Sequence, residues 1–460
     1  MIRTKFSTCV VLTALVSGLT SCGFFKTDKL VDPNNISVAS FVNNPTRDQV
    51  NLLAVGVQAV PRTGYLDLIR ITSTVGREGI NSASTDNRYF TELLGTTAAT
   101  FGGATDPNGI FNTYYTSFSS TRRVAEFFNL ACQSATALSA AEKAGAKGFA
   151  RTIQGWAMLE LLNMQYKNGI RSGYTDLNTP GDMLKPLKFT DYAGGLDLVI
   201  STLNDGATSL DAAGTTFAFA SAFTSGWAGF TTPATMKQVN RAFAARAYMY
   251  KQDWANMNTA LSQSFLSLTG SLTVGPQLNF ANAQNDTPNS LFQNPDGNGA
   301  PYVLFDDIVT GAEPGDKRIA TKTRKRTTAR SSGAISSSYE IQLYASNAAP
   351  ISIIRNEELV LMSAEAKAQT GDLPGATAAI NVVRTTAGLA AYSGAATKDA
   401  LITEVLNQRK YSLLFEGHRW FDARRYNLLT TLPYSTSPYK VFDSMVRPNA
   451  ETQWELANPL

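Results

Sequence analysis

The chain has 460 residues, with 40 Lys and Arg against 36 Asp and Glu, and its formal net charge is +4. This near balance gives no reason to expect nucleic acid or a strongly acidic polymer as a partner. Hydrophobic residues make up 43% and charged residues 17%, which is typical of a globular core with a polar surface. The length suits two or three average domains or one large domain.

The N-terminus predicts an export signal that ends in a lipid anchor. Arg3 and Lys5 precede an uncharged, largely apolar run over residues 6–19. This run is shorter than the roughly 20 residues that a membrane-spanning helix needs. Two small residues then lead to Cys22, an arrangement that resembles the bacterial lipobox. We therefore expect membrane attachment through lipid on Cys22.

Processing at this point would remove residues 1–21, the signal peptide, and make Cys22 the first residue. The next segment, 22–44, is rich in turn formers and indicates a lipidated tether. The alternative is an ordinary cleaved signal followed by an incidental cysteine. Of the other two cysteines, Cys9 lies in the signal and Cys132 is expected to be a buried, inert thiol, so no intramolecular disulfide is expected after processing.

Hydrophobic periodicity predicts several helices in the first half of the chain. A first helix is expected over residues 45–60, and Pro61 is expected to end it. Residues 64–109 have weak periodicity and are rich in Gly, Ser, Thr and Asn, which indicates a loop region. Further helices are predicted over residues 110–131, 140–166 and 192–210.

The connection that follows is unusually aromatic, with Phe217, Phe219, Phe223, Trp227 and Phe230. A long connection that fills the core explains this composition best, because each ring has a large apolar surface to bury. An exposed ligand platform is the alternative.

Two helical hairpins have the most regular pattern in the sequence. The first covers residues 233–265 and the second covers residues 355–383, and each has small residues on its first helix. Both resemble tetratricopeptide units, although here insertions separate the copies. The intervening residues 270–350 are expected to be mostly irregular, and their basic run from Lys317 to Arg330 is expected to be solvated.

Residues suited to catalysis or metal binding are scarce. His418 is the single histidine of the sequence, and with one unmodified cysteine left no His/Cys zinc cluster can form. We expect His418 to be buried, paired and structural. The turn at Asp296 could bind calcium through its oxygens, but it lacks a spaced series of acidic ligands. No catalytic residue, metal site or cofactor is therefore predicted.

Three separated motifs in the last quarter resemble those of the SusD/RagB family of outer-membrane lipoproteins. The motifs are residues 354–366 (IRNEELVLMSAEA), residues 380–384 (INVVR) and residues 415–425 (FEGHRWFDARR). They stand in the expected order and accompany the lipobox. The sequence departs from the family pattern at Gln408, Lys410 and Tyr426, which puts little in doubt about the fold.

The resemblance implies a mainly α-helical, SusD-like fold in one domain over residues 45–460, with the RagB/SusD-type part over about 351–460. It also implies a non-enzymatic protein that captures an oligosaccharide or other nutrient oligomer at the cell surface. The implied partner is a SusC-like TonB-dependent transporter in the outer membrane. The family scaffold is tetratricopeptide-like, and the irregular loops are expected to hold ligand.

Aromatic rings cover the apolar faces of sugars, while Asn, Asp and Arg side chains bond their hydroxyls. The loop region contains this mixture of residues. The candidate ligand-binding residues are Tyr65, Arg70, Arg77, Asn81, Tyr89 and Phe101.

Two other hypotheses stay open at this point. One is a peptide-binding scaffold in the cell envelope, built on the tetratricopeptide-like hairpins. The other is a secreted hydrolase that uses His418. The identity of the nutrient, and whether calcium is bound, cannot be read from the sequence.

Overall fold

The computed structural model describes residues 43–82, 86–174, 186–297, 302–332 and 335–459. Its first helix, α3 (Arg47–Ala59), begins at a capping box in which Thr46 and Gln49 bond each other's backbone N–H groups. The helix therefore begins two residues later than the predicted start at residue 45. The next helix, α4 (Pro61–Val75), begins at the proline that was expected to end α3.

The expectation of a loop directly after Pro61 was therefore wrong. Proline is tolerated in the first turn of a helix, where its missing N–H has no intrahelical partner to lose. Most of α4 beyond its first turn is buried, including Ile69, Ile71 and Val75. Tertiary burial thus stabilises a helix whose Thr- and Ile-rich sequence has weak intrinsic propensity.

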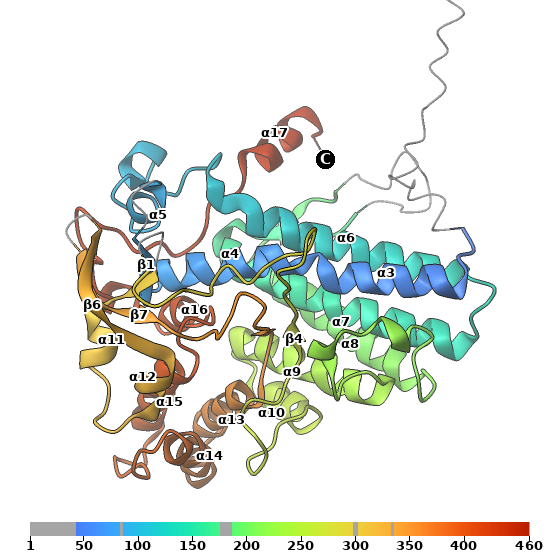
Figure 1. The fold of residues 1–460 in the computed structure, drawn as a ribbon. Coiled ribbons are helices and arrows are strands. Elements are labelled where there is room, and N and C mark those ends of the chain that lie inside the picture. The colour runs from blue at the N-terminus through green and yellow to red at the C-terminus, as the bar shows by residue number, and fades with distance from the viewer. Residues whose placement is uncertain (1–42, 83–85, 175–185, 298–301, 333–334, 460) are drawn as a thin grey trace, which may run out of the picture. The chain divides into compact units, whose positions relative to one another are not determined.

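The scaffold consists of helices that follow one another in the chain and pack side by side (Figure 1). Each helix contacts the next in the series α6 (Thr113–Ser134), α7 (Ala140–Gln165), α8 (Tyr192–Asp211) and α9 (Pro233–Lys251). Glycines on α7 allow a close approach, because a Cβ at Gly148 or Gly155 would lie 2.5 Å from a leucine of α8. These helices were predicted from periodicity, and the structure confirms them.

The aromatic connection between α8 and α9 fills the core, as predicted. Phe217, Phe219, Trp227 and Phe230 are buried. Phe219 packs on Phe149 of α7 with a centroid distance of 5.3 Å. The rings therefore seal the helical layer and do not form an exposed platform.

Both predicted hairpins are present. The first pairs α9 with α10 (Trp254–Ser262), and the second pairs α13 (Asn356–Thr370) with α14 (Leu373–Thr386). Asp253 and Asp372 cap the second helix of each pair. The chain then continues through α15 (Lys398–Ser412), α16 (Arg419–Arg425) and α17 (Asn449–Ala457).

A four-stranded antiparallel sheet in the order β1-β5-β7-β6 was not predicted. Its strands are β1 (Gly79–Asn81), β5 (Tyr302–Leu304), β7 (Ile335–Ile341) and β6 (Thr323–Ser332). The short helices α11 (Asp306–Thr310) and α12 (Lys317–Lys322) lie between β5 and β6 in the chain, and α5 (Arg88–Thr91) and the 3₁₀ helix η2 (Ala98–Phe101) follow β1. Two-stranded pairs are β2 (Ile170–Arg171) with β3 (Phe189–Thr190), and β4 (Gln277–Leu278) with β8 (Ile351–Ser352).

The basic run from Lys317 to Arg330 is therefore ordered, and part of it is buried. Arg324 and Arg326 both pair with Glu340 across the β6–β7 hairpin. Arg318 is buried against Asp316 at 2.7 Å. The expectation of a fully solvated run was wrong because Asp316 and Glu340 neutralise three of these cations.

No helix among the described ranges is long and apolar enough to cross a membrane. The predicted signal peptide, Cys22 and the tether lie outside the described residues, apart from the last two positions of the tether.

Candidate functional site

Candidate ligand-binding residues from α4, β1 and α5 come together beside the sheet. Arg70 donates to Asp67 at 2.8 Å and contacts Ser290, and its side chain is 18% exposed. Burial lowers the pKa of Arg70, but nearby Tyr302 and Asp67 more than offset this, so the net shift is upward. Tyr89 shifts the pKa in the same direction. The guanidinium is thus a fixed, permanent cation among hydroxyl groups.

Sheet register brings Asn81 to the same place. Asn81 of β1 lies opposite Tyr302 of β5, and its amide donates to the Tyr302 hydroxyl at 3.4 Å. Burial raises the pKa of Tyr302 to about 12, so its hydroxyl keeps its proton and can donate a hydrogen bond. We name Asp67, Arg70, Asn81, Tyr89 and Tyr302 the Arg70 cluster.

Tyr89 supplies the aromatic surface of the Arg70 cluster. The residue is half-buried, and its ring stands edge-on to Phe111 with a centroid distance of 5.3 Å. Among the described residues its hydroxyl has no hydrogen-bond partner. A fixed ring beside a guanidinium and an amide can cover the apolar face of a sugar and bond its hydroxyls.

Tyr302 was missed by the sequence analysis. It lies in a segment expected to be irregular, more than 200 residues from Asn81 along the chain. A tyrosine followed by apolar residues is a weak strand signal, and only the pairing of β1 with β5 places it in the site.

The other three candidates lie elsewhere. Tyr65 is 3% exposed, packs edge-on to Trp156 and donates its hydroxyl to the Ser352 carbonyl at 3.1 Å. Among the described residues, the half-buried ring of Phe101 at the end of η2 makes no aromatic contact with Tyr89.

Arg77 is 0% exposed and clamps several chain segments through backbone carbonyls. Its guanidinium donates to the carbonyls of Thr74, Pro433 and Lys440 at 2.9–3.1 Å. Burial, with a smaller effect from Arg419, lowers its pKa to about 9. The polar atoms of Tyr65 and Arg77 are used by the protein itself, so neither side chain is open to a ligand in this conformation.

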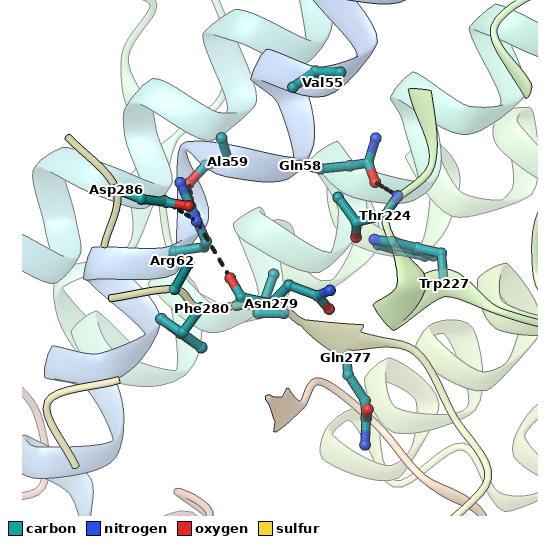
Figure 2. Close-up of a pocket in the computed structure, with 12 residues that line it drawn as sticks. Val55, Gln58, Ala59, Arg62, Thr224, Trp227, Gln277, Asn279, Phe280 and Asp286 are labelled. Atoms are coloured by element: carbon teal, nitrogen blue, oxygen red, sulfur yellow. Dashed lines mark hydrogen bonds and ion pairs between the residues drawn. The ribbon is translucent and has the colours of Figure 1, made fainter. Parts of the chain in front are cut away.

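A cleft of about 350 Å³ lies between the end of α3, the start of α4 and β4 (Figure 2). Its polar groups are mostly paired: Arg62 bonds Asp286 at 2.6 Å, and Gln58 bonds the backbone of Ala222 and Thr224. Trp227 is 1% exposed, so little of its ring can stack on a ligand. Most polar groups of the cleft are thus already bonded within the protein, although the side-chain oxygen of Asn279 has no hydrogen-bond partner among the described residues.

The interior contains a charged centre around His418. Arg246 bonds Glu358 at 2.6 and 2.7 Å and Glu160 at 3.0 Å, while the His418 imidazole lies 3.8 Å from Glu358. Burial lowers the pKa of His418 to about 4, so the ring is neutral near pH 7. The prediction that His418 is buried is confirmed.

Neither a nucleophile paired with His418 nor a metal-binding cluster is present within the described ranges. The His418 ring has no Ser or Cys partner there, and no group of three His, Cys, Asp or Glu side chains could hold a metal ion. Cys132 is buried, and burial raises the pKa of its thiol to about 12, so the thiol is unreactive near neutral pH.

Comparison with known proteins gives the family signal in the C-terminal part. Residues 320–457 match the model of the SusD family. No curated protein matches the sequence significantly.

Solved structures with the same fold cover nearly all of the chain. A SusD superfamily protein from Bacteroides vulgatus ATCC 8482 is 16% identical over 89% of this chain and 97% of its own, with a TM-score of 0.65. Surface glycan-binding protein A from Bacteroides uniformis is 15% identical over 90% and 98%, with a TM-score of 0.68. NanU from B. fragilis is 15% identical over 90% and 95%, with a TM-score of 0.63.

At these identities the structures establish the fold, and the family model supplies the sequence signal. The predicted mainly α-helical, SusD-like architecture is confirmed. The described part of the chain therefore has the SusD-like fold, and residues 320–457 carry the sequence pattern of the SusD family.

Proposed function

We propose that this chain is a non-enzymatic cell-surface lipoprotein that binds a nutrient oligomer, in the first instance an oligosaccharide. It would work with a SusC-like TonB-dependent transporter in outer-membrane uptake. The fold supports this proposal, and one of the solved structures that shares it is named as a surface glycan-binding protein.

The observation that carries the proposal is the assembly of the Arg70 cluster. Arg70, Asn81 and Tyr89 come from three separate elements and meet around Tyr302, where Arg70 and Tyr89 are partly exposed while Asn81 and Tyr302 are buried. Guanidinium, amide, phenol and aromatic ring together match the hydroxyls and apolar faces of a sugar. We place the ligand there, with Phe101 as an outlying candidate contact.

Affinity electrophoresis tests this proposal with native gels that contain starch, xylan, pectin or mucin. We expect at least one polysaccharide to retard the wild-type protein. Arg70→Ala and Tyr89→Ala should each weaken the retardation tenfold or more. Each substitution removes a side chain that would contact the sugar, and water replaces that contact poorly in the bound state.

Arg62→Ala is the matched control. Arg62 and Arg70 both lie on α4, both pair with an aspartate, and their side chains are 20% and 18% exposed. Arg62 lines the cleft and not the Arg70 cluster. Loss of retardation in Arg62→Ala alone would move the ligand to the cleft, and retention in all three variants would contradict the proposed site.

The lipid anchor and the transporter are proposed from the sequence. Removal of residues 1–21 would leave lipidated Cys22, a tether to residue 44 and a single SusD-like domain over residues 45–460. Cys22→Ser should release the protein from the membrane fraction, and the wild type should co-purify from mild detergent with a large β-barrel. A membrane-bound Cys22→Ser protein would contradict the anchor.

The peptide-scaffold alternative has less support from the geometry. In the second hairpin, α15 packs on both α13 and α14 and buries apolar residues of each. A peptide would have to displace or avoid this helix.

A further inference from the structure

A second pocket lies between α6 and the start of α17, away from the Arg70 cluster on α4 and β1. Its volume is about 290 Å³. One face of α6 contributes residues at three- and four-residue intervals, and the other walls come from Tyr174, three residues after the end of β2, and from the first turn of α17. The lining includes Tyr115, Thr116, Ser119, Ser120, Arg123, Tyr174 and Glu451.

Arg123 is distinctive in this pocket. It is half-buried, its Nε atom is fully buried, and that atom has no hydrogen-bond partner. Among the arginines of the described ranges, Arg123 alone makes no hydrogen bond or ion pair. An unpaired guanidinium that is partly removed from water is unfavourable, so the fold gains nothing from this cation unless something else completes it.

Neighbouring carboxylates do not neutralise Arg123, because other cations already hold them. Glu451 accepts from Arg171 at 2.8 and 2.9 Å. Glu126, one turn further along α6, accepts from Arg151 at 2.6 Å. The Arg123 guanidinium is therefore a cation without a carboxylate partner among the described residues, next to arginine–glutamate pairs.

Hydroxyl groups surround this cation. Thr116, Ser119 and Ser120 lie on the same face of α6 as Arg123, and their side chains have no hydrogen-bond partner in the described chain. Tyr174 forms a wall, and its hydroxyl donates to the Ser119 carbonyl at 3.4 Å. The pocket thus combines one fixed positive charge, several free hydroxyls and an aromatic wall.

We propose that this pocket binds the carboxylate of an acidic monosaccharide unit, such as a uronic acid, with Arg123 as the carboxylate ligand. The arginine fork matches the two oxygens of a carboxylate. A singly charged group fits better than a phosphate, because one cation is open and Glu451 lies in the same wall. The volume is near the lower end of ligand pockets, about 300 Å³, and suits one sugar ring.

That the carboxylate belongs to a sugar rests on the proposed function. That the pocket binds an anion rests on Arg123 itself. The test is ligand-observed NMR titration of the purified protein with sodium D-galacturonate, D-galactose and sodium acetate. The variants are Arg123→Gln and, as the matched charge control, Arg47→Gln, whose exposed side chain pairs with Glu142.

We expect galacturonate to bind more tightly than galactose or acetate. Arg123→Gln should weaken galacturonate binding tenfold or more, and Arg47→Gln should leave it unchanged. Equal affinity of the wild type and Arg123→Gln for galacturonate would overturn the proposal. Acetate that binds as tightly as galacturonate would overturn the sugar class, and galactose that binds as tightly would overturn recognition of the charge.

Thermal unfolding without ligand gives an independent readout. Because Arg123 has no partner to lose, Arg123→Gln should unfold at the same temperature as the wild type or a higher one. A drop of several degrees would show that Arg123 holds the fold, which would also overturn the proposal. If polysaccharide retardation through the Arg70 cluster persists while galacturonate fails to bind, this inference fails and the proposed function stands.

Discussion

The buried interior of the helical scaffold and the two proposed ligand sites use their charged residues in opposite ways. In the scaffold, Arg246 with Glu358 and Arg425 with Glu365 form pairs in which every side chain is at most 8% exposed. At the two proposed sites, Arg70 is partly exposed, and Arg123 has no hydrogen-bond or ion-pair partner among the described residues. Charge fixes the architecture in the first region and is left available in the second.

This difference explains why the three family-like motifs in the last quarter of the chain give little information about which ligand is bound. The motif residues Arg355, Glu358, Glu365, Glu416 and Arg425 are partners of one another or of the core. A pattern built from such pairs identifies the fold because the pairs hold the fold. The residues available to a ligand lie outside it, in segments that match the family least.

Breaking a buried scaffold pair should have the largest effect. Glu358→Ala leaves Arg246 with Glu160 as its remaining carboxylate partner in a dry interior, and we expect a loss of about 3–5 kcal/mol in the free energy of unfolding. Chemical denaturation measures it. The control is Asp197→Ala, which breaks an exposed pair with Lys251 and should cost about 0–1 kcal/mol. Similar losses in the two variants would remove the contrast between buried and exposed charges.

A buried carboxyl group should make stability depend on pH. Burial raises the pKa of Glu78 to about 7, although Arg419 opposes the shift, whereas an unfolded glutamate titrates near 4.3. Between these values the folded state binds more protons, so this group's contribution to stability falls as pH rises and is fully lost above about pH 7. The loss is about 4 kcal/mol.

Glu78→Gln removes this titration. Relative to the wild type, the variant should become progressively more stable from pH 5 to pH 8, as measured by denaturation at each pH. Parallel pH curves for the two proteins would show that Glu78 does not titrate in this range.

The sequence predicted the elements whose signals are local. The caps at Asp253 and Asp372 and the periodicity of α6 to α9 mark their helices without help from distant residues. The continuation of α4 beyond Pro61 and the sheet were missed, because both are stabilised by partners far along the chain. A strand of three residues such as β5 has only a weak local signal of its own.

The candidate site residues show the same contrast between what local sequence predicts and what distant partners decide. Residue type was enough to nominate Arg70, Asn81 and Tyr89, and the structure brings them together, although ligand contact stays a prediction. Residue type could not distinguish them from Tyr65 and Arg77, which the fold encloses. Residue type could not single out Arg123 either. Whether an arginine is paired depends on where the fold places the carboxylates of other elements.

The smallest expected effect distinguishes the Arg70 cluster from the core. Tyr302→Phe removes the hydroxyl that Asn81 contacts, and Tyr65→Phe removes the hydroxyl that bonds the Ser352 carbonyl. Each loses one neutral hydrogen bond, so each should change the free energy of unfolding by about 1 kcal/mol or less. Polysaccharide retardation should weaken a few-fold in Tyr302→Phe, because Asn81 loses its anchor, and should stay unchanged in Tyr65→Phe. Equal retardation in both variants would mean that the Tyr302 hydroxyl serves only the fold, which would leave Arg70 and Tyr89 to carry recognition.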